Sequence, residues 1–304
     1  MPSNRPLQHL CQPRPYQLER VGPGRLCIWA PAKINLNLIV RPRRDDGFHE
    51  IDSIVSRITL YDKLELSSRD DGQITLACAG LDCGPDQDNL ALLAARALAR
   101  KVTGRGAHIL LQKNIAAGAG LGGGSSDAAA TLRGTNLLWD EPLSDEELAE
   151  MALSLGSDVP LFLGAPSVRM TGRGEELQPV AVHPFAAVLA MPDSACATSE
   201  VYEAFDQSPE QTAEQLGLGV FSRPTSQWRA KLVNQLRQAA EAVSPALAGF
   251  GRELQEHLDP PVCLTGSGSA MFALYDSAEK AEDELSGLPQ HLMDRCRVVR
   301  SNPW

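Results

Sequence analysis

Polar and apolar residues alternate with a period of two in one short segment near the start of the patterned part of the chain. From Lys33 to Val40 the even positions are apolar, and three odd positions carry polar residues, Lys33, Asn35 and Asn37. Successive side chains of a strand point to opposite faces of the sheet. The segment is therefore predicted to be a strand with one buried and one polar face, and Lys33 and Asn35 are expected to point the same way.

The rest of the chain divides into further segments with strand or helix periodicity. Strands are expected at 48–66, 108–113, 187–191, 262–264, 270–275 and 296–299, with a hairpin across 168–180. Helices are expected at 89–102, 127–138, 144–155, 228–242, 245–257 and 278–286. Ser144 and Glu147 form a capping box at the start of the third helix, and 45–47 is predicted to be a turn. This order of strands and helices predicts an α+β fold with two layers.

Domain organisation follows from the length of the chain and from its first residues. Residues 1–24 hold five prolines among arginine and glutamine without periodicity, which predicts a flexible extension with order beginning near Leu26. A chain of 304 residues favours two domains, because single cores rarely grow beyond about 250 residues. We expect one domain at 25–180 and a second at 181–304.

Composition excludes several classes of function. Hydrophobic residues make up 43% of the chain and charged residues 22%, as in ordinary globular proteins. The net charge of −10 argues against a nucleic-acid partner, which requires a basic surface. No apolar stretch approaches the roughly 18 residues of a membrane span, and no apolar signal-peptide core precedes the patterned region. The seven cysteines contain no CxxC pair, so reduced thiols in a cytoplasmic protein are expected.

The strongest chemical signal is a glycine-rich segment between a predicted strand and an Ala-rich helix. Its residues are Ala116, Ala117, Gly118, Ala119, Gly120, Leu121, Gly122, Gly123, Gly124, Ser125 and Ser126. Glycines allow several backbone N–H groups to converge on an anion, and the following helix adds the positive end of its dipole. The two serines could cap that helix or donate to a phosphate or a metal-bound water. The segment is predicted to be a phosphate-binding loop rather than a flexible linker.

The same loop also matches the dinucleotide-binding pattern GxGxxG at Gly118, Gly120 and Gly123. That pattern requires a second strand that ends in an acidic residue about 20 positions later. Two predicted helices follow here, so the dinucleotide interpretation fails. A Walker A loop fails as well, because no Gly-Lys-Ser/Thr follows the glycines.

Five motifs, in this order, resemble the GHMP kinases, the superfamily of galactokinase, homoserine kinase and mevalonate kinase. They are 31–38 (PAKINLNL), 46–50 (DGFHE), the glycine loop, 156–160 (GSDVP) and 264–269 (LTGSGS). Within the superfamily they are similar to the branch that phosphorylates a cytidine-diphosphate-linked polyol for non-mevalonate isoprenoid biosynthesis. The resemblance extends from about Leu26 to the C-terminus. A kinase of the mevalonate or homoserine type, and a non-catalytic nucleotide-binding homologue, remain alternatives.

The resemblance implies a fold and a set of ligands. The N-terminal domain would be ribosomal-protein-S5-like and the C-terminal domain ferredoxin-like, with a small-molecule substrate between them. ATP would be the phosphoryl donor, accompanied by Mg²⁺. The sequence shows no dedicated carboxylate cage, so no protein ligand of the metal is assigned beyond Ser126 as a candidate, and a weak homodimer is compatible with the family.

Two charged residues are implied to carry the chemistry. Lys33 would neutralise charge near the transferred phosphoryl group. Asp158 is expected close to a helix start, where the dipole stabilises a carboxylate. The resemblance implies that Asp158 faces Lys33 and accepts the proton of the substrate hydroxyl.

The resemblance also implies residues that recognise the substrate. Asn35 would bind the polyol, Phe48 would stack on the cytosine, and His49 would bind the edge of the base, although a buried structural histidine is the alternative. Tyr202 is the candidate for the other side of the base, with a core residue on a helix as its alternative.

Two further segments are implied to support the site. Thr265 and Gly266, in the loop 265–268, would close over the site and support the strand of Lys33. Lys113, which precedes the glycine loop, either approaches the nucleotide or is an ordinary surface lysine.

Overall fold

A larger sheet forms one end of the molecule in the computed structural model, which describes residues 18–45, 47–102, 104–140, 143–194, 196–207 and 213–301. Its strands follow the order β1-β2-β3-β5-β4, and β6 and β7 extend it from β3. Their bounds are β1 Leu18–Gly22, β2 Arg25–Arg43, β3 His49–Arg69, β4 Ile74–Gly80, β5 Gly106–Lys113, β6 Ser167–Thr171 and β7 Glu176–Pro179. All neighbouring strands are antiparallel except the parallel pair β4–β5.

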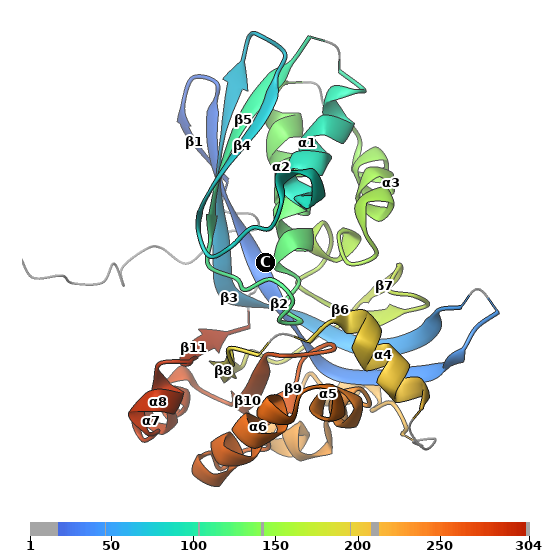
Figure 1. The fold of residues 1–304 in the computed structure, drawn as a ribbon, viewed down its shortest axis with the longest axis vertical. Helices are drawn as coiled ribbons and strands as arrows, with labels where there is room; N and C mark the ends of the chain where they lie inside the picture. Colours follow the sequence, from blue (N-terminus) through green and yellow to red (C-terminus); the bar gives the residue numbers. More distant parts are fainter. Residues whose placement is uncertain are drawn as a thin grey trace, which may run out of the picture.

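Two helices cover one face of this sheet, α1 (Leu90–Ala99) and α2 (Gly123–Leu138), and α3 (Asp145–Leu155) packs against these helices, as Figure 1 shows. Alanine and leucine side chains of α1 and α2 are buried against the sheet, so the helices approach it closely. The side chain of Asn89 caps α1 by accepting from two backbone N–H groups. The capping box predicted at Ser144 and Glu147 is confirmed at the start of α3.

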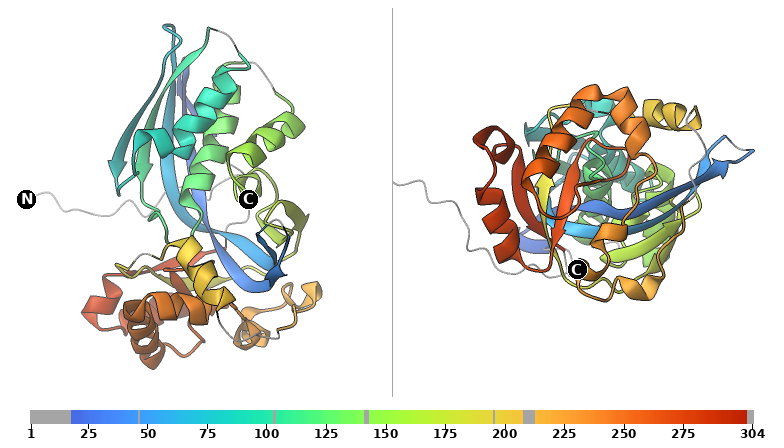
Figure 2. Two further views of the ribbon diagram at one scale, coloured as in Figure 1. Left: turned by 45° about the vertical axis from the view of Figure 1, so that its right-hand side comes forward. Right: turned by 90° about the horizontal axis from the view of Figure 1, so that it is seen from below.

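A smaller antiparallel sheet of order β11-β8-β10-β9 lies at the other end of the molecule (Figures 1 and 2). Its strands are β8 Ala186–Ala190, β9 Cys263–Leu264, β10 Met271–Tyr275 and β11 Cys296–Arg300. The helices of this half are α4 Thr198–Asp206, α5 Arg237–Val243, α6 Pro245–His257, α7 Ala278–Ser286 and α8 Gln290–Met293. The 3₁₀ helices are η1 Asp86–Asp88, η2 Pro160–Phe162, η3 Leu218–Val220, η4 Thr225–Gln227 and η5 Arg229–Lys231. The predicted α+β class is confirmed.

The long strands β2 and β3 connect the two halves. Their register shifts after Pro31 and again after Asn35, and the buried face of β2 changes its packing partners at these shifts. Leu26, Ile28 and Ala30 belong to one hydrophobic core, under α1 and α2. Ala32, Ile34 and Leu36 belong to a second core, against β8 and β10. The predicted polar face is buried as well, because the second half of the chain covers it.

Order begins earlier than the sequence predicts. Leu18–Gly22 forms β1 and pairs with β2, so residues 18–24 belong to the sheet and the expectation of an extension up to residue 24 is wrong there. Residues 1–17 lie outside the described residues, as does Asp46 of the expected turn at 45–47. We propose that a boundary between Pro179 and Ala186 separates two domains, each with its own sheet.

The helix predicted at 228–242 is wrong over its first half. Only Arg237–Val243 is α-helical there, and a single 3₁₀ turn covers Arg229–Lys231. The backbone between them binds the edge of β2, where Leu38 N donates to Val233 O and Gln235 N donates to Leu38 O. These tertiary hydrogen bonds replace the local ones that a helix would make.

None of the helices in the described ranges is both long and apolar enough to cross a membrane.

Candidate active site

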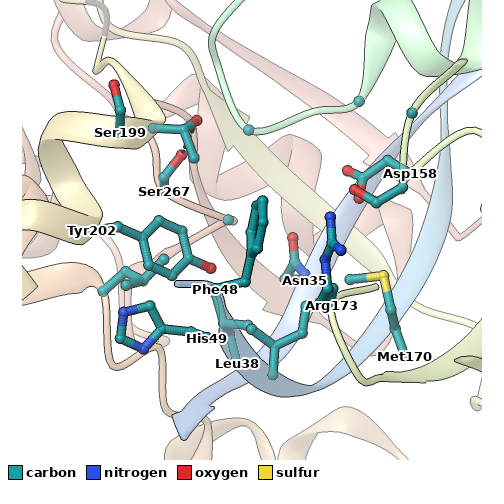
Figure 3. Close-up of a pocket in the computed structure, with 18 of the residues that line it drawn as sticks. Asn35, Leu38, Phe48, His49, Asp158, Met170, Arg173, Ser199, Tyr202 and Ser267 are labelled. Carbon is teal, nitrogen blue, oxygen red and sulfur yellow. Dashed lines mark hydrogen bonds between the residues drawn. The ribbon is translucent and has the colours of Figure 1, made fainter. Parts of the chain in front are cut away.

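A pocket of about 670 Å³ lies where the two halves of the chain meet. It is lined by residues of β2, the tip of the β2–β3 hairpin, the glycine loop, the segment 156–158, the β6–β7 turn, α4 and the loop after β9. Figure 3 shows Tyr202 and His49 on one side of this pocket and Asp158 on the other. All five motifs of the sequence therefore contribute to one cavity.

The glycine loop adopts a backbone that favours glycine. Gly118, Gly120 and Gly122 have φ angles of 67°, 73° and 68°, in the left-handed region. A Cβ atom on Gly120 would lie 2.3 Å from the carbonyl oxygen of Thr265, and one on Gly122 would lie 2.9 Å from a ring carbon of Phe162. The loop therefore packs so closely against both halves that larger residues do not fit.

The helix after the loop starts earlier than predicted. α2 begins at Gly123, with Gly122 in the N-cap position and no side-chain cap, so Ser125 and Ser126 lie inside its first turns. Of the two roles expected for these serines, capping of the helix is therefore excluded. The hydroxyl of Ser126 is buried without a hydrogen-bond partner, whereas Ser125 lines the pocket. The first N–H groups of α2 are left for an anion.

Backbone contacts fix the loop directly beside Lys33. The N–H of Lys33 donates to the carbonyl oxygen of Leu121 over 2.9 Å. A Cβ atom on Gly122 would approach the Cγ atom of Lys33 to 3.1 Å. From the loop that leads into β10, Ala270 N donates to Ala119 O over 3.1 Å. The structure thus brings the glycine loop and Lys33 together.

Lys33 is 5% exposed, and its Nζ atom donates to Asn35 Oδ1 over 2.6 Å. Asn35 in turn donates to Ser53 Oγ, and its backbone N–H donates to Thr265 Oγ1 over 2.9 Å. The expected support of this strand by Thr265 is confirmed, and the neighbouring Gly266 lines the pocket. Burial lowers the pKa of Lys33, and the negative charge of Asp158 partly offsets this effect.

Asp158 lines the same pocket but does not stand at the start of an α-helix. It lies in a turn, and the following 3₁₀ helix η2 has Val159 as its N-cap, so the helix-dipole rationale for this carboxylate is wrong. A Cβ atom on Gly174, in the β6–β7 turn, would lie 3.8 Å from Asp158 Oδ1. The carboxylate is therefore positioned between the segment 156–158 and the predicted hairpin, which is confirmed as β6–β7.

Two aromatic residues project into the other end of the pocket (Figure 3). Phe48 is 52% exposed, and the guanidinium of Arg173 lies 3.8 Å from the centre of its ring. Tyr202 comes from α4, and burial raises the pKa of its hydroxyl to about 12. Arg173, which the sequence reasoning missed, brings a positive charge into the pocket beside an exposed ring.

The imidazole of His49 faces a protein oxygen at each nitrogen, with hydrogen-bond geometry at Nδ1 and only a short contact at Nε2. Nδ1 lies 2.9 Å from the carbonyl oxygen of Arg41, to which it donates, and Nε2 lies 3.0 Å from Asp206 Oδ1. The ring also packs against Tyr202, with 5.4 Å between the ring centres, and the side chain is only 7% exposed. These contacts favour the alternative that the His49 ring is structural. Asp206 was not identified from the sequence.

Lys113 is neither at the surface nor alone. Its Nζ atom donates to Asp62 Oδ2 and to Asp127 Oδ2, the latter over 2.8 Å, and the three side chains are at most 5% exposed. Of the two alternatives for Lys113, the ordinary surface lysine is therefore excluded. One signal was present in the sequence, since Asp62 occupies an apolar phase of the period-two pattern in β3, between Leu60 and Leu64.

Comparisons with known proteins agree with this arrangement. A family profile described as the GHMP kinases N terminal domain matches residues 89–164. A 4-diphosphocytidyl-2-C-methyl-D-erythritol kinase of Desulfotalea psychrophila is 40% identical over 83% of this chain and 86% of its own length. The enzyme of that name from Bacillus pumilus is 35% identical over 89% of this chain and 95% of its own length. The chain belongs to the 4-diphosphocytidyl-2-C-methyl-D-erythritol kinase family, within the GHMP kinases.

Solved structures support the same membership. A crystal structure of a 4-(cytidine 5'-diphospho)-2C-methyl-D-erythritol kinase superposes with a TM-score of 0.75 at 31% identity, covering 90% of this chain and 99% of that one. Homoserine kinase from Cytophaga hutchinsonii superposes with a TM-score of 0.66 at 15% identity, covering 93% of this chain and 96% of that one, and shares the fold alone.

A metal ion in this GHMP kinase pocket would find few protein ligands. Within the described ranges, no group of three or more His, Cys, Asp and Glu side chains is arranged to hold a metal ion. Ser126 Oγ, buried and unpartnered near the N-terminus of α2, is an oxygen donor of the type that Mg²⁺ accepts. The donor set therefore fits a metal bound mainly by nucleotide phosphates and water, with Ser126 Oγ as a candidate protein ligand.

Proposed function

We propose that the chain transfers the terminal phosphoryl group of ATP to the 2-hydroxyl of 4-diphosphocytidyl-2-C-methyl-D-erythritol, in non-mevalonate isoprenoid precursor biosynthesis. One observation carries this proposal. Lys33, Asp158 and the glycine loop line the same pocket as the aromatic pair Phe48 and Tyr202. A kinase centre and a slot suited to a base therefore share one cavity.

The glycine loop would bind the phosphates of ATP. Residues 116–126 supply backbone N–H groups and the N-terminus of α2, and together these favour negative charge. When bound, Mg²⁺ would neutralise charge on the phosphates, and the hydroxyl of Ser126 would be its candidate protein ligand. Because Gly122 packs on the Lys33 side chain, the loop would hold the phosphates within reach of that ammonium.

Asp158 would accept the proton of the attacking hydroxyl, and Lys33 would stabilise the charge that develops on the transferred group. Phosphoryl transfer depends mainly on positioning and electrostatic stabilisation. Burial lowers the pKa of Lys33, and the negative charge of a bound phosphate would favour its charged form by direct attraction. Asn35 would hold Lys33 in place and bind the polyol.

The opposite end of the pocket would bind the cytidine diphosphate part of the substrate. Phe48 and Tyr202 would stack on the two faces of the cytosine. The backbone of His49 lies beside this slot, whereas its ring Nδ1 donates to the Arg41 carbonyl and its Nε2 faces Asp206. Arg173 offers a guanidinium suited to the diphosphate, since its planar donors match phosphate oxygens.

The proposed setting is the cytoplasm. All six cysteines of the described ranges are free thiols: Cys27, Cys78, Cys83, Cys196, Cys263 and Cys296. Such thiols persist where the compartment is reducing. A weak homodimer stays a prediction.

A panel of alcohols tests the proposal directly. The purified protein would be given ATP and Mg²⁺ with the cytidyl polyol, mevalonate or homoserine, and ADP release would be followed. We expect turnover of the cytidyl polyol alone. Turnover of mevalonate or homoserine without it would favour another GHMP kinase, and no turnover of any alcohol despite ATP binding would favour a non-catalytic homologue.

A further inference from the structure

An acidic residue ends helix α4, where helix electrostatics disfavour it. Asp206 is the last residue of α4, and the last turn of that helix contains no basic residue. The C-terminal end of a helix carries partial negative charge, so a carboxylate there is destabilising. Its presence is therefore not explained by the stability of α4, and its partners lie elsewhere.

Two side chains at the tip of the β2–β3 hairpin lie within ion-pair distance of Asp206. Oδ1 lies 3.0 Å from His49 Nε2, and Oδ2 lies 3.6 Å from a guanidinium nitrogen of Arg43. Arg43 ends β2 and His49 begins β3. Arg43 also donates from Nε to the carbonyl oxygen of Gly47 over 2.8 Å, which braces the turn between the strands. One carboxylate thus contacts both strands of the hairpin.

The same face of α4 carries two further site residues. Thr198, Tyr202 and Asp206 follow one another at intervals of four, so they lie on one face of the helix. All three line the pocket. Thr198 is hydrogen-bonded to Ser267 in the loop after β9, with 2.9 Å between the two hydroxyl oxygens. α4 is therefore fixed to that loop at its start and to the hairpin tip at its end, with Tyr202 between.

We propose that Asp206 is a positioning residue that sets the width of the base-binding slot. His49 directly follows Phe48, so an imidazole held by Asp206 and by the Arg41 carbonyl also fixes the backbone that carries Phe48. On the other side, the His49 ring packs on Tyr202. Asp206 thereby holds Phe48 and Tyr202 at a constant separation. This inference rests on the proposed function, in which these two rings bind the base.

Two substitutions of Asp206 separate positioning from bulk structure. In Asp206→Ala the hairpin tip loses its link to α4, and we expect KM for the cytidyl substrate to rise about tenfold, the size of one lost polar contact. KM for ATP and kcat should stay within about twofold, because the glycine loop and Lys33 make no contact with this link. In Asp206→Asn the amide can still pair with His49 Nε2, so we expect most of the wild-type KM to be retained.

A matched control and a double substitution complete the test. Glu200→Ala removes the same charge from an exposed position of α4 that does not line the pocket, and it should leave every kinetic constant near wild type. If Asp206 acts through His49, the double variant His49→Ala with Asp206→Ala should be no worse than His49→Ala alone. Thermal unfolding of each variant would be measured alongside.

Three results would overturn the inference. The first is an Asp206→Ala variant with an unchanged KM for the cytidyl substrate. The second is a rise in both KM values with a comparable fall in kcat and a large drop in the melting temperature. This result would indicate a general structural role. The third is additive effects of the His49 and Asp206 substitutions. Failure of the proposed function is distinguishable, because the wild-type protein itself would then not turn over the cytidyl polyol.

Discussion

Lys33 Nζ donates a hydrogen bond of 2.6 Å to Asn35 Oδ1, two residues along the same strand. Asn35 is fixed in turn by Ser53 and Thr265, from β3 and from the loop after β9. The ammonium is therefore oriented beside the glycine loop before any phosphate arrives, so little reorganisation is needed during the reaction. The period-two polar face of β2 is thus an element of the site rather than a solvated surface.

The lowered pKa of Lys33 leads to a pH dependence of activity. The charged form is the active one, so kcat/KM should fall as the pH rises through a pKa that lies below the ordinary lysine value of 10.5. The guanidinium introduced by Lys33→Arg would stay protonated throughout, so the lower activity of that variant should lack this alkaline fall. Measuring kcat/KM for ATP between about pH 7 and 11 checks both expectations. Identical alkaline limbs in the two proteins would assign the titration to another group.

Replacement of Asp158 should affect turnover far more than binding. Asp158→Ala removes the group proposed to accept the hydroxyl proton, and we expect kcat to fall by about 10²–10⁴. The dissociation constant of ATP, measured by calorimetry without the second substrate, should change little because the phosphate loop is intact. Asp145→Ala, on the exposed start of α3, is a matched loss of an aspartate outside the pocket. Activity of Asp158→Ala equal to that of this control would exclude Asp158 as the base.

Phe48 is expected to contribute to substrate affinity through stacking. Phe48→Ala should cost roughly 1–3 kcal/mol of binding to the cytidyl substrate and leave KM for ATP unchanged, whereas Phe48→Tyr should retain the ring and the affinity. Leu153→Ala is a suitable control, since Leu153 is a large apolar residue of similar exposure on α3, at 50% against 52% for Phe48. The quantity to measure is the dissociation constant of the cytidyl substrate. An unchanged dissociation constant in Phe48→Ala would show that the base does not bind at this end of the pocket.

Local pattern was sufficient for most elements, because their hydrogen bonds are local or their burial is periodic. The strand from Lys33 to Val40 and the capped helix after Ser144 were predicted in this way. The segment before Arg237 was not, because its backbone binds the edge of β2, almost 200 residues earlier in the chain. Sequence periodicity contains no information on which distant edge a segment will meet.

The site shows the same division between local and distant information. The glycine loop is recognisable alone, and the roles of Lys33 and Asp158 came from the resemblance to a family. Asp206 and Arg173 were missed because each becomes part of the pocket only when α4 and the β6–β7 turn meet the hairpin tip. An aspartate at a helix end or an arginine in a turn has an ordinary surface role in most proteins.

Lys113 gives a stability prediction with a matched control elsewhere in the same sheet. It is buried between Asp62 and Asp127, and Asp62 also accepts from the backbone N–H of Ile115 at the entrance of the glycine loop. Lys113→Met would leave two buried carboxylates without their cation, at a cost of about 3–5 kcal/mol of unfolding free energy. Lys63→Met breaks the ion pair with Glu65, whose N–O distance of 2.8 Å equals that of the Lys113–Asp127 pair. The side chain of Lys63 is 40% exposed, so the expected loss of unfolding free energy is about 0–1 kcal/mol.

Asp127→Asn separates the charge of this cluster from its geometry. Burial raises the pKa of Asp127 well above its ordinary value, so the negative charge of this side chain is costly to keep. An asparagine oxygen can still accept from Lys113 Nζ, and we expect Asp127→Asn to be less destabilising than Lys113→Met. Urea unfolding of the three variants and the wild type gives the comparison. Equal losses for Lys113→Met and Lys63→Met would show that the buried cluster contributes no more than an exposed ion pair, and the anchoring of the glycine loop would then depend on its backbone contacts alone.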